Sequence, residues 1–247
     1  MKQKYMKNIF LIAIIIIFSS CSRNENESIA INEFITPDYV FSNYFFDCNL
    51  NDGSSLLKLE SFLSEFIKKS IFQNKNLYSL KVFFPENTVI EKFKISIRNN
   101  TKENIFSDVI NQLSQNGFDE IASCNFNPSL FKGLSLYKFI DEQRASSNTI
   151  EILRCLYNPG FNYGTFRISL DRFINKINRL KIYYGIEYYQ EESQSNEFLW
   201  INYLYAEDFS NNISSNWLND PDSIEIKNEF NNNAECIEAI KYKFFEI

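Results

Sequence analysis

Two copies of a Cys-x-x-Asn-x-Gly motif hold the residues with the clearest chemical potential in this sequence. They are CNLNDG, which begins at Cys48, and CLYNPG, which begins at Cys155. A thiol can form a disulfide, and an amide can contact a ligand at the mouth of a pocket. Asn-Asp-Gly and Asn-Pro-Gly also favour tight turns. We favour the turn, which would end a strand and aim a helix, and keep ligand contact by Asn51 and Asn158 as the alternative.

Other chemistry is sparse in the sequence. The chain has no histidine, which removes Ser-His-Asp and Cys-His catalysis, His-ligated zinc and the proximal ligand of many haem proteins. Its six glycines form no nucleotide-binding loop. The acid pairs at 191–192 and 220–222 lie in polar sequence and are interpreted as solvated turns. The sequence therefore predicts no catalytic residue, no metal ligand and no cofactor.

Aromatic residues are abundant, with 25 Phe, 14 Tyr and 2 Trp. We expect Trp200 on a central strand and Trp217 on a second helix, where both could line a cavity between sheet and helices. Packing into an ordinary core is the favoured alternative. Together with Asn51 and Asn158 they form the set of candidate pocket residues, which suits a small apolar ligand.

The N-terminal segment has the pattern of an export signal. Three lysines precede an apolar run from Ile9 to Phe18, which at about ten residues is too short to span a bilayer. The following FSSC resembles a bacterial lipobox, although Phe18 replaces the usual Leu. We expect residues 1–20 to be a lipoprotein signal peptide, Cys21 to be lipidated and residues 21–36 to be a tether. An ordinary signal peptide is the alternative.

The expected location follows from this signal. Ser22, rather than Asp, follows the lipidated cysteine, a pattern that resembles sorting to the outer membrane. We expect an outer-membrane lipoprotein that faces the periplasm, with the inner membrane and the cell surface as alternatives. Removal of residues 1–20 takes three of the 25 basic residues and none of the 31 acidic ones, which leaves a net charge of −9. This acidic balance argues against a nucleic-acid partner.

An internal repeat predicts the architecture. At an offset of 107 residues from Cys48, seven of 23 aligned residues are identical, and both copies continue with an apolar stripe at helical spacing. Each copy then shows two aromatic or β-branched runs, a second helix and a last strand. The expected strands are 39–48, 77–84, 92–97 and 134–140, then 150–155, 181–189, 198–206 and 240–247. The second helices are expected at 105–113 and 209–217, the latter ending near Pro221.

The order β-α-β-β-α-β, found twice, is that of the ferredoxin-like unit. We therefore expect an α+β protein with two tandem ferredoxin-like modules, residues 37–147 and 148–247. Strands such as YYGIEYY are apolar on both faces, so each sheet needs cover opposite its helices. The predicted arrangement packs the modules sheet to sheet as an intrachain pseudo-dimer, so we expect a monomer.

Paired modules of this kind resemble the dimeric α/β-barrel superfamily, which includes antibiotic-biosynthesis monooxygenases and haem-degrading enzymes. The motif is also similar to that of marine bacterial proteins built from two such modules. The resemblance covers Pro37 to Ile247. It implies the fold and, more weakly, a cofactor-independent oxygenase acting on a small aromatic substrate.

The remaining four cysteines are predicted to form disulfides. Their even number suits an oxidising compartment. In a ferredoxin-like sheet the first and last strands are antiparallel neighbours. Because Cys48 and Cys155 end first strands whereas Cys124 and Cys236 precede last strands, the expected pairs are Cys48–Cys124 and Cys155–Cys236. Four separate buried thiols are the alternative.

These observations lead to an expected function with one alternative. The chain lacks the commonest catalytic residues and carries an anchor, so we expect a non-enzymatic envelope lipoprotein that binds a small apolar ligand or another envelope protein. The monooxygenase-like enzyme is the alternative. A cavity with a buried Asn, Tyr or Trp cluster would favour the enzyme, whereas a filled core would favour interaction.

The lipid anchor is tested by the variant Cys21→Ser. Stable anchoring requires two or more acyl chains, so loss of the acceptor thiol should release the protein from membranes and block normal processing. Membrane fractionation and mass spectrometry of the N-terminal peptide measure both effects. A variant that stays membrane-bound and is processed normally would contradict the lipoprotein prediction.

Overall fold

The structure is a computed structural model of the chain. It describes residues 37–70, 73–74, 77–86, 91–101, 103–126, 129–139, 149–180, 184–191, 196–204, 217 and 220–246. Cys21 and the expected signal and tether segments lie outside the described residues, as does the expected module boundary at 147/148.

The described elements follow the predicted order in both halves. The first half contains β1 (Phe41–Leu50), α3 (Leu56–Lys69), β2 (Tyr78–Pro85), β3 (Lys92–Asn99), α4 (Phe106–Gln115), a 3-10 turn (Phe118–Glu120), β4 (Ala122–Cys124) and β5 (Leu130–Phe139). The second half contains β6 (Thr149–Tyr157), α5 (Tyr163–Leu180), β7 (Tyr184–Glu191), β8 (Glu197–Leu204), α7 (Pro221–Asn233) and β9 (Ala234–Glu246). Within the described part of the chain, no helix has the length and apolar character that crossing a membrane requires.

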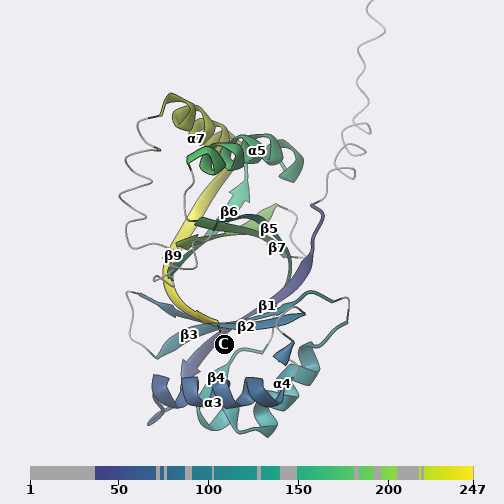
Figure 1. Cartoon of the computed structure of the whole chain (residues 1–247), viewed down its shortest axis with the longest axis vertical. Helices are drawn as coiled ribbons and strands as arrows, with labels where there is room; N and C mark the ends of the chain where they lie inside the picture. Colours follow the sequence, from purple (N-terminus) through teal and green to yellow (C-terminus); the bar gives the residue numbers. More distant parts are fainter. Residues whose placement is uncertain are drawn as a thin grey trace, which may run out of the picture. The chain divides into compact units, whose positions relative to one another are not determined.

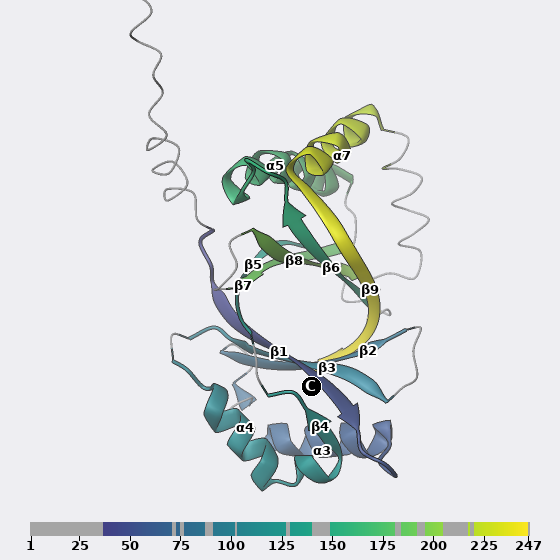
Figure 2. The same ribbon diagram turned by 180° about the vertical axis from the view of Figure 1, so that it is seen from behind.

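All nine strands belong to one antiparallel sheet with the order β3-β2-β9-β6-β8-β7-β5-β1-β4. Because β3 also pairs with β1, eight of these strands close into a ring, with β4 attached outside it along β1 (Figure 1). The two long strands β5 and β9 join the halves: β5 pairs with β1 and with β7, and β9 pairs with β6 and with β2. In Figure 2, β9 runs from α7 along one side of the ring to β2. The expectation of two separate sheets packed face to face therefore differs from the structure, in which edge hydrogen bonds make the sheet continuous.

Local signals explain where the helices begin. The Ser55 hydroxyl accepts a hydrogen bond from the backbone of Lys58 and caps α3. Asp220 caps α7 in the same way, with Pro221 in the first turn. The prediction that a helix ends near Pro221 is not contradicted, because Trp217 is helical and Pro221 begins the next helix, whereas α7 itself was not predicted. The predicted helix over 209–217 falls almost entirely outside the described residues.

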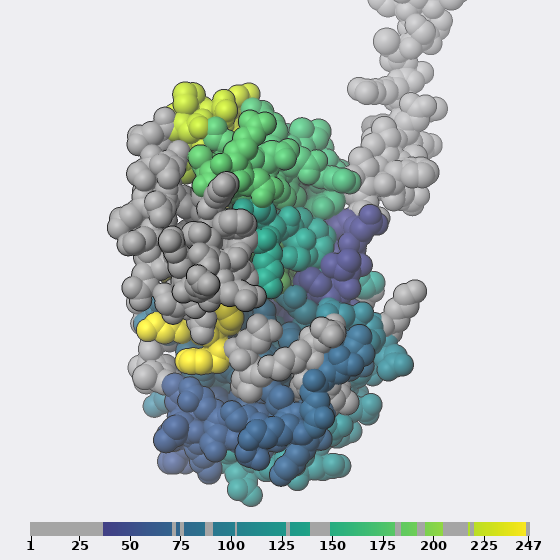
Figure 3. All heavy atoms as spheres, in the orientation of Figure 1, coloured from purple at the N-terminus to yellow at the C-terminus, as the bar shows by residue number. Residues whose placement is uncertain are grey.

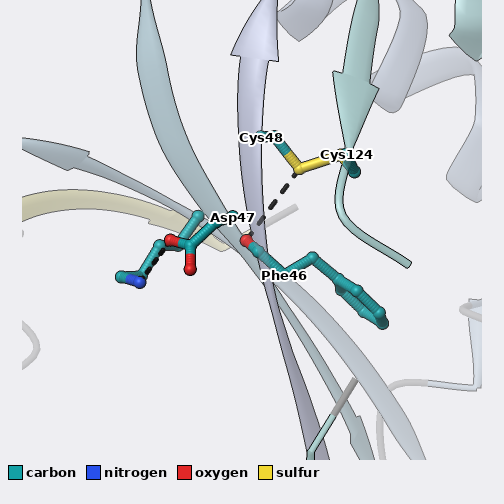
Figure 4. Close-up of a disulfide and its surroundings, with 5 residues drawn as sticks. Phe46, Asp47, Cys48 and Cys124 are labelled. Carbon is teal, nitrogen blue, oxygen red and sulfur yellow. Dashed lines mark hydrogen bonds and ion pairs between the residues drawn. A yellow bond between two sulfur atoms is a disulfide. The ribbon is translucent and has the colours of Figure 1, made fainter. Parts of the chain in front are cut away.

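The strands divide their side chains between the ring interior and the helical faces. Figure 4 shows this alternation on β1, where Asp47 and Cys48 project to opposite faces. One buried cluster lies between the first-half strands and the helices α3 and α4, and another lies between the second-half strands and α5 and α7. A third, which includes Phe41, Phe83 and Phe244, lies inside the ring. The helices cover opposite ends of the body formed by residues 37–246, as the surface in Figure 3 shows for α3 and α5.

A buried ion pair crosses the ring interior between the halves. Arg98 on β3 donates to Glu187 on β7 over 2.6 Å, and the hydroxyls of Tyr189 and Tyr203 donate to the same carboxylate over 2.6 and 2.7 Å. Burial alone would raise the pKa of Glu187. The charges of Arg98 and Lys81, together with these hydrogen bonds, instead lower that pKa from 4.5 to about 2. The carboxylate therefore remains ionised in the core and holds strands of both halves.

The variant Glu187→Gln tests this ion pair. Removal of one partner leaves Arg98 buried without its counter-charge, which should cost about 3–5 kcal/mol of unfolding free energy. The depressed pKa adds stability that is complete above the unfolded pKa of 4.5 and is lost as the pH falls toward about 2. Urea titrations between pH 7 and pH 3 should show this loss in the wild type and a weaker one in the variant. Glu65→Gln, which breaks the exposed pair with Lys68, is the control and should change little. Equal stabilities of the two variants would contradict the prediction.

Candidate functional site

The repeated motif joins the first strand of each half to the segment that leads into its last strand. Disulfides link Cys48 to Cys124 and Cys155 to Cys236, which are the predicted pairs. Each joins directly opposed residues of neighbouring antiparallel strands, as Figure 4 shows for Cys48 and Cys124. The pairing therefore follows from the strand order.

The motif asparagines make matching hydrogen bonds. The Asn51 amide donates to the carbonyl of Asp119 over 2.8 Å, and the Asn158 amide donates to the carbonyls of Asn231 and Asn232 over 2.9 and 3.0 Å. Asp119 and Asn231 each precede the second disulfide cysteine by five residues. The glycines of both motifs have a positive φ, 78° at Gly53 and 85° at Gly160, which favours glycine. Each motif is thus a turn whose amide fastens the end of the first strand to the helical turn that precedes β4 in the first half and β9 in the second.

The main concave feature of the second half lies between its strands and the helices α5 and α7, and we call it the α5/α7 pocket. Its cavity volume is about 690 Å³, within the range of small-molecule sites. Three of the candidate pocket residues, Asn158, Trp200 and Trp217, line it, whereas Asn51 lines a separate depression in the first half. Half of the described residues that line it are aromatic: Phe166, Phe173, Tyr184, Phe198, Trp200, Trp217 and Phe230.

The aromatic rings of the α5/α7 pocket hold one another in place. Phe166 of α5 meets Trp200 edge to face with ring centroids 5.9 Å apart, and Phe173 meets Trp217 in the same geometry at 5.2 Å. Phe230 of α7 contacts the rings of both phenylalanines. These contacts produce a rigid apolar wall suited to a flat ligand.

A hydrogen-bonded polar cluster lies behind this wall. The Trp200 indole donates to the side-chain oxygen of Asn202 over 2.5 Å, and the Tyr184 hydroxyl donates to the same oxygen. The Asn202 amide nitrogen donates to the carboxylate of Glu151 over 3.1 Å. Because a carboxylate only accepts, this bond decides which end of the amide faces Trp200 and Tyr184. Burial raises the pKa of the Tyr184 hydroxyl well above its usual range, so this group keeps its proton.

On β1 and β3, the first half has apolar and aromatic residues at the positions that correspond to Glu151, Trp200 and Asn202 on β6 and β8. Across β1 and β3, Phe46 faces Ile95 and Tyr44 faces Ile97. At the repeat offset of 107, the matching pairs across β6 and β8 are Leu153 with Trp200 and Glu151 with Asn202. The isoleucines are fully buried beneath α3 and α4. The second half has therefore placed a buried amide and a carboxylate where its sister half has an apolar core.

The sequence interpretation missed Tyr184, Asn202 and Glu151. One signal for Asn202 was present, since this amide interrupts the apolar and aromatic run FLWINYL that begins at Phe198. A polar residue at such a position needs a buried partner. Nothing in the local sequence points to Glu151, which reaches Asn202 only because β6 and β8 are neighbours. Among the described residues, no group of three or more Cys, Asp and Glu is arranged to hold a metal ion.

Comparison with known proteins identifies the fold. No protein-family model and no curated protein matches the sequence. A solved structure from Lactobacillus acidophilus that carries the provisional name monooxygenase matches with a TM-score of 0.53 at 8% identity, over 83% of this chain and 94% of that one. A second provisional monooxygenase, from Fusobacterium nucleatum, matches with 0.51 at 12% identity, over 84% and 94%. A haem-binding protein of Thermus thermophilus matches with 0.55 at 8% identity, over 84% and 92%. The chain thus shares the ferredoxin-like α+β fold of these proteins.

These findings correct the expected function. The prediction of a non-enzymatic binding or interaction module is wrong, because the solved structures with this fold are described as monooxygenases and as a haem-binding protein. The α5/α7 pocket, an aromatic cavity backed by a Trp–Asn–Tyr cluster, is the kind of feature that was expected to favour the enzyme over a protein-interaction module.

The amide fastening is tested by Asn51→Ala and Asn158→Ala. Loss of one hydrogen bond should lower the unfolding free energy by about 1 kcal/mol at Asn51, and loss of two by about 2 kcal/mol at Asn158. Urea titration with the disulfides intact measures both. Asn49→Ala, an exposed residue of the same strand, is the control. If both variants unfold like this control, the motif asparagines do not fasten the strands.

Proposed function

We propose that the protein is a cofactor-independent monooxygenase-like enzyme that oxidises a small aromatic substrate in the α5/α7 pocket. The observation that carries the proposal is the hydrogen-bonded pair of half-buried Glu151 and buried Asn202, whose amide oxygen accepts from Trp200 and Tyr184 at the wall of an aromatic cavity. The first half, built on the same strand order, has Tyr44 and Ile97 at the registers of that pair. The names of the solved structures that share the fold support the same class of reaction.

The chemistry needs no electron donor besides the substrate. Conversion of a ring CH₂ into C=O by O₂, with release of water, removes four electrons from the substrate and adds four to oxygen, so atoms and electrons balance. Such a substrate is an electron-rich aromatic such as a hydroxyanthrone. The pocket's contribution is to bind the flat ring system, to exclude water and to admit O₂, which is small and apolar.

The polar cluster would orient the reacting molecule. Trp200 and Tyr184 line the pocket, whereas Asn202 and Glu151 act on them from behind and are therefore positioning residues. Because the Tyr184 hydroxyl resists ionisation, we assign it the role of a hydrogen-bond partner and not of a base. Loss of the amide would release both side chains into other rotamers.

Haem fits this chain poorly. The sequence has no histidine, and its two methionines are Met1 and Met6 in the expected signal peptide. Apart from Cys21, the chain has four cysteines, and all four are joined in disulfides. The tyrosine that lines the pocket keeps its proton and is hydrogen-bonded to Asn202. The described pocket therefore lacks the usual protein ligands of haem iron. Haem binding by the Thermus thermophilus protein is for this reason not inferred for this chain.

Two further aspects belong to this proposal. We infer that the halves act together as an intrachain equivalent of a dimer, which the repeated strand order and the shared strands β5 and β9 support. Such a protein would be a monomer, anchored through Cys21 at the outer membrane and facing the periplasm.

Oxygen consumption by the full-length protein tests the proposed reaction. With a panel of hydroxyanthrones and no added reductant, at least one compound should be oxidised with uptake of one O₂ per CH₂ converted. Asn202→Leu should lower kcat by about 100-fold, because misorientation by as little as about 1 Å has effects of that size. Tyr44→Phe removes a hydroxyl at the register of Glu151 in the other half and should leave turnover unchanged. Absence of turnover across the panel, or equal turnover in Asn202→Leu, would overturn the proposal.

A further inference from the structure

Lys227 is the one cation among the described residues that line the α5/α7 pocket. It belongs to α7 together with Phe230 and Asn231, three and four residues further along, and Ala234 follows at the start of β9. All four line the pocket, and residues at this spacing lie on one face of a helix. Lys227 therefore stands one helical turn from the aromatic wall at Phe230.

The acidic residues closest to Lys227 along α7 are already bound to cations of α5. Arg172 pairs with Glu225 over 3.1 Å and also with Glu229. Lys176 pairs with Asp222 over 3.2 Å and also with Asp220. None of the ion pairs formed by the described residues involves Lys227. Glu235, the one acid among the described residues that line the pocket, is exposed on β9, and Lys227 is likewise exposed at the pocket's rim.

From this arrangement we infer that the α5/α7 pocket binds flat aromatic anions, with Lys227 as the residue that pairs with the anionic group. The wall provides stacking and edge contacts for the rings, and the ammonium provides an unpaired positive charge in a protein that is otherwise acidic. Phenolates, enolates and carboxylates share this chemistry. The inference rests on the proposed function for the identity of the site, and it names the class of substrate.

The assignment also has a consequence for the reaction. A cation beside a bound phenol favours its ionised form, because an opposite charge at close range lowers the pKa of an acid. An ionised electron-rich ring gives up electrons to O₂ more readily than a neutral one. Lys227 would thus contribute both to binding and to activation, without itself forming a covalent bond.

A thermodynamic cycle tests the charge pairing without any need for turnover. Isothermal titration of the full-length protein uses 2-naphthoate and its neutral isostere 2-naphthamide at low ionic strength. The wild type should bind the carboxylate at least about tenfold more tightly than the amide, a difference that 0.5 M salt reduces. Lys227→Met should abolish this preference and leave the amide's affinity within about twofold of its wild-type value. Lys227→Arg should retain the preference, and Lys58→Met, on the exposed side of α3, should behave like the wild type.

The outcomes separate this inference from the proposed reaction. Equal binding of the two probes by the wild type, no binding of either, or an equal loss of both in Lys227→Met would overturn the inference. A preference that depends on Lys227 supports it even if no compound consumes oxygen, in which case the oxygenase proposal alone fails. Turnover of neutral substrates that is insensitive to Lys227→Met would keep the oxygenase and overturn the anionic class.

Discussion

Closure of the ring by the edges of its strands is the constraint on which the rest of the structure depends. An open four-stranded sheet leaves two edges with unpaired backbone groups. Here β5 pairs with β7 and β9 pairs with β2, so each half provides the partner for the other's edge. At the end of the β1–β5 pairing, the ring of Phe41 lies directly against Gly133 of β5, and a Cβ at this position would overlap that ring. Once the ring is closed, its interior needs a core of its own, and aromatic side chains with the Arg98–Glu187 pair provide it.

This closure separates stability from the candidate site. Side chains that point into the ring bind the two halves, whereas alternate side chains on the same strands point toward the helices. Glu187 and Tyr188, adjacent on β7, show the division: the former accepts from Arg98 inside the ring, and the latter packs on Phe198 beneath the helices. The helical face of the second half can therefore hold a cavity while the ring keeps the strands in register. Cys236 of β9 lines that cavity, and its disulfide with Cys155 joins β9 to the neighbouring strand β6.

The two halves show how one scaffold supports different interiors. Both have the disulfide, the asparagine fastening and the positive-φ glycine at matching places. They differ beneath the helices, where Ile95 and Ile97 occupy the registers of Trp200 and Asn202. A buried amide is costly unless it is paired, and at these registers the Asn202 amide and its Glu151 partner occur only in the second half, which favours chemistry at the site over the needs of the fold.

The sequence by itself determined the element order, the internal repeat and the cysteine pairing, because turn residues, apolar periodicity and the position of a cysteine along its strand are local properties. It also pointed to Trp200, Trp217 and Asn158, since these residues stand out by type and place. Only the tertiary structure decided that the halves share one ring of strands, because edge pairing between residues as distant as Val82 and Phe245 leaves no local trace. The same holds for Glu151, Tyr184 and Lys227, which become neighbours of one pocket through strand order and helix packing. The helix α7 was not predicted, because Asp-Pro is compatible with a turn and with a helix cap, and only the packing of the following residues on α5 distinguishes the two.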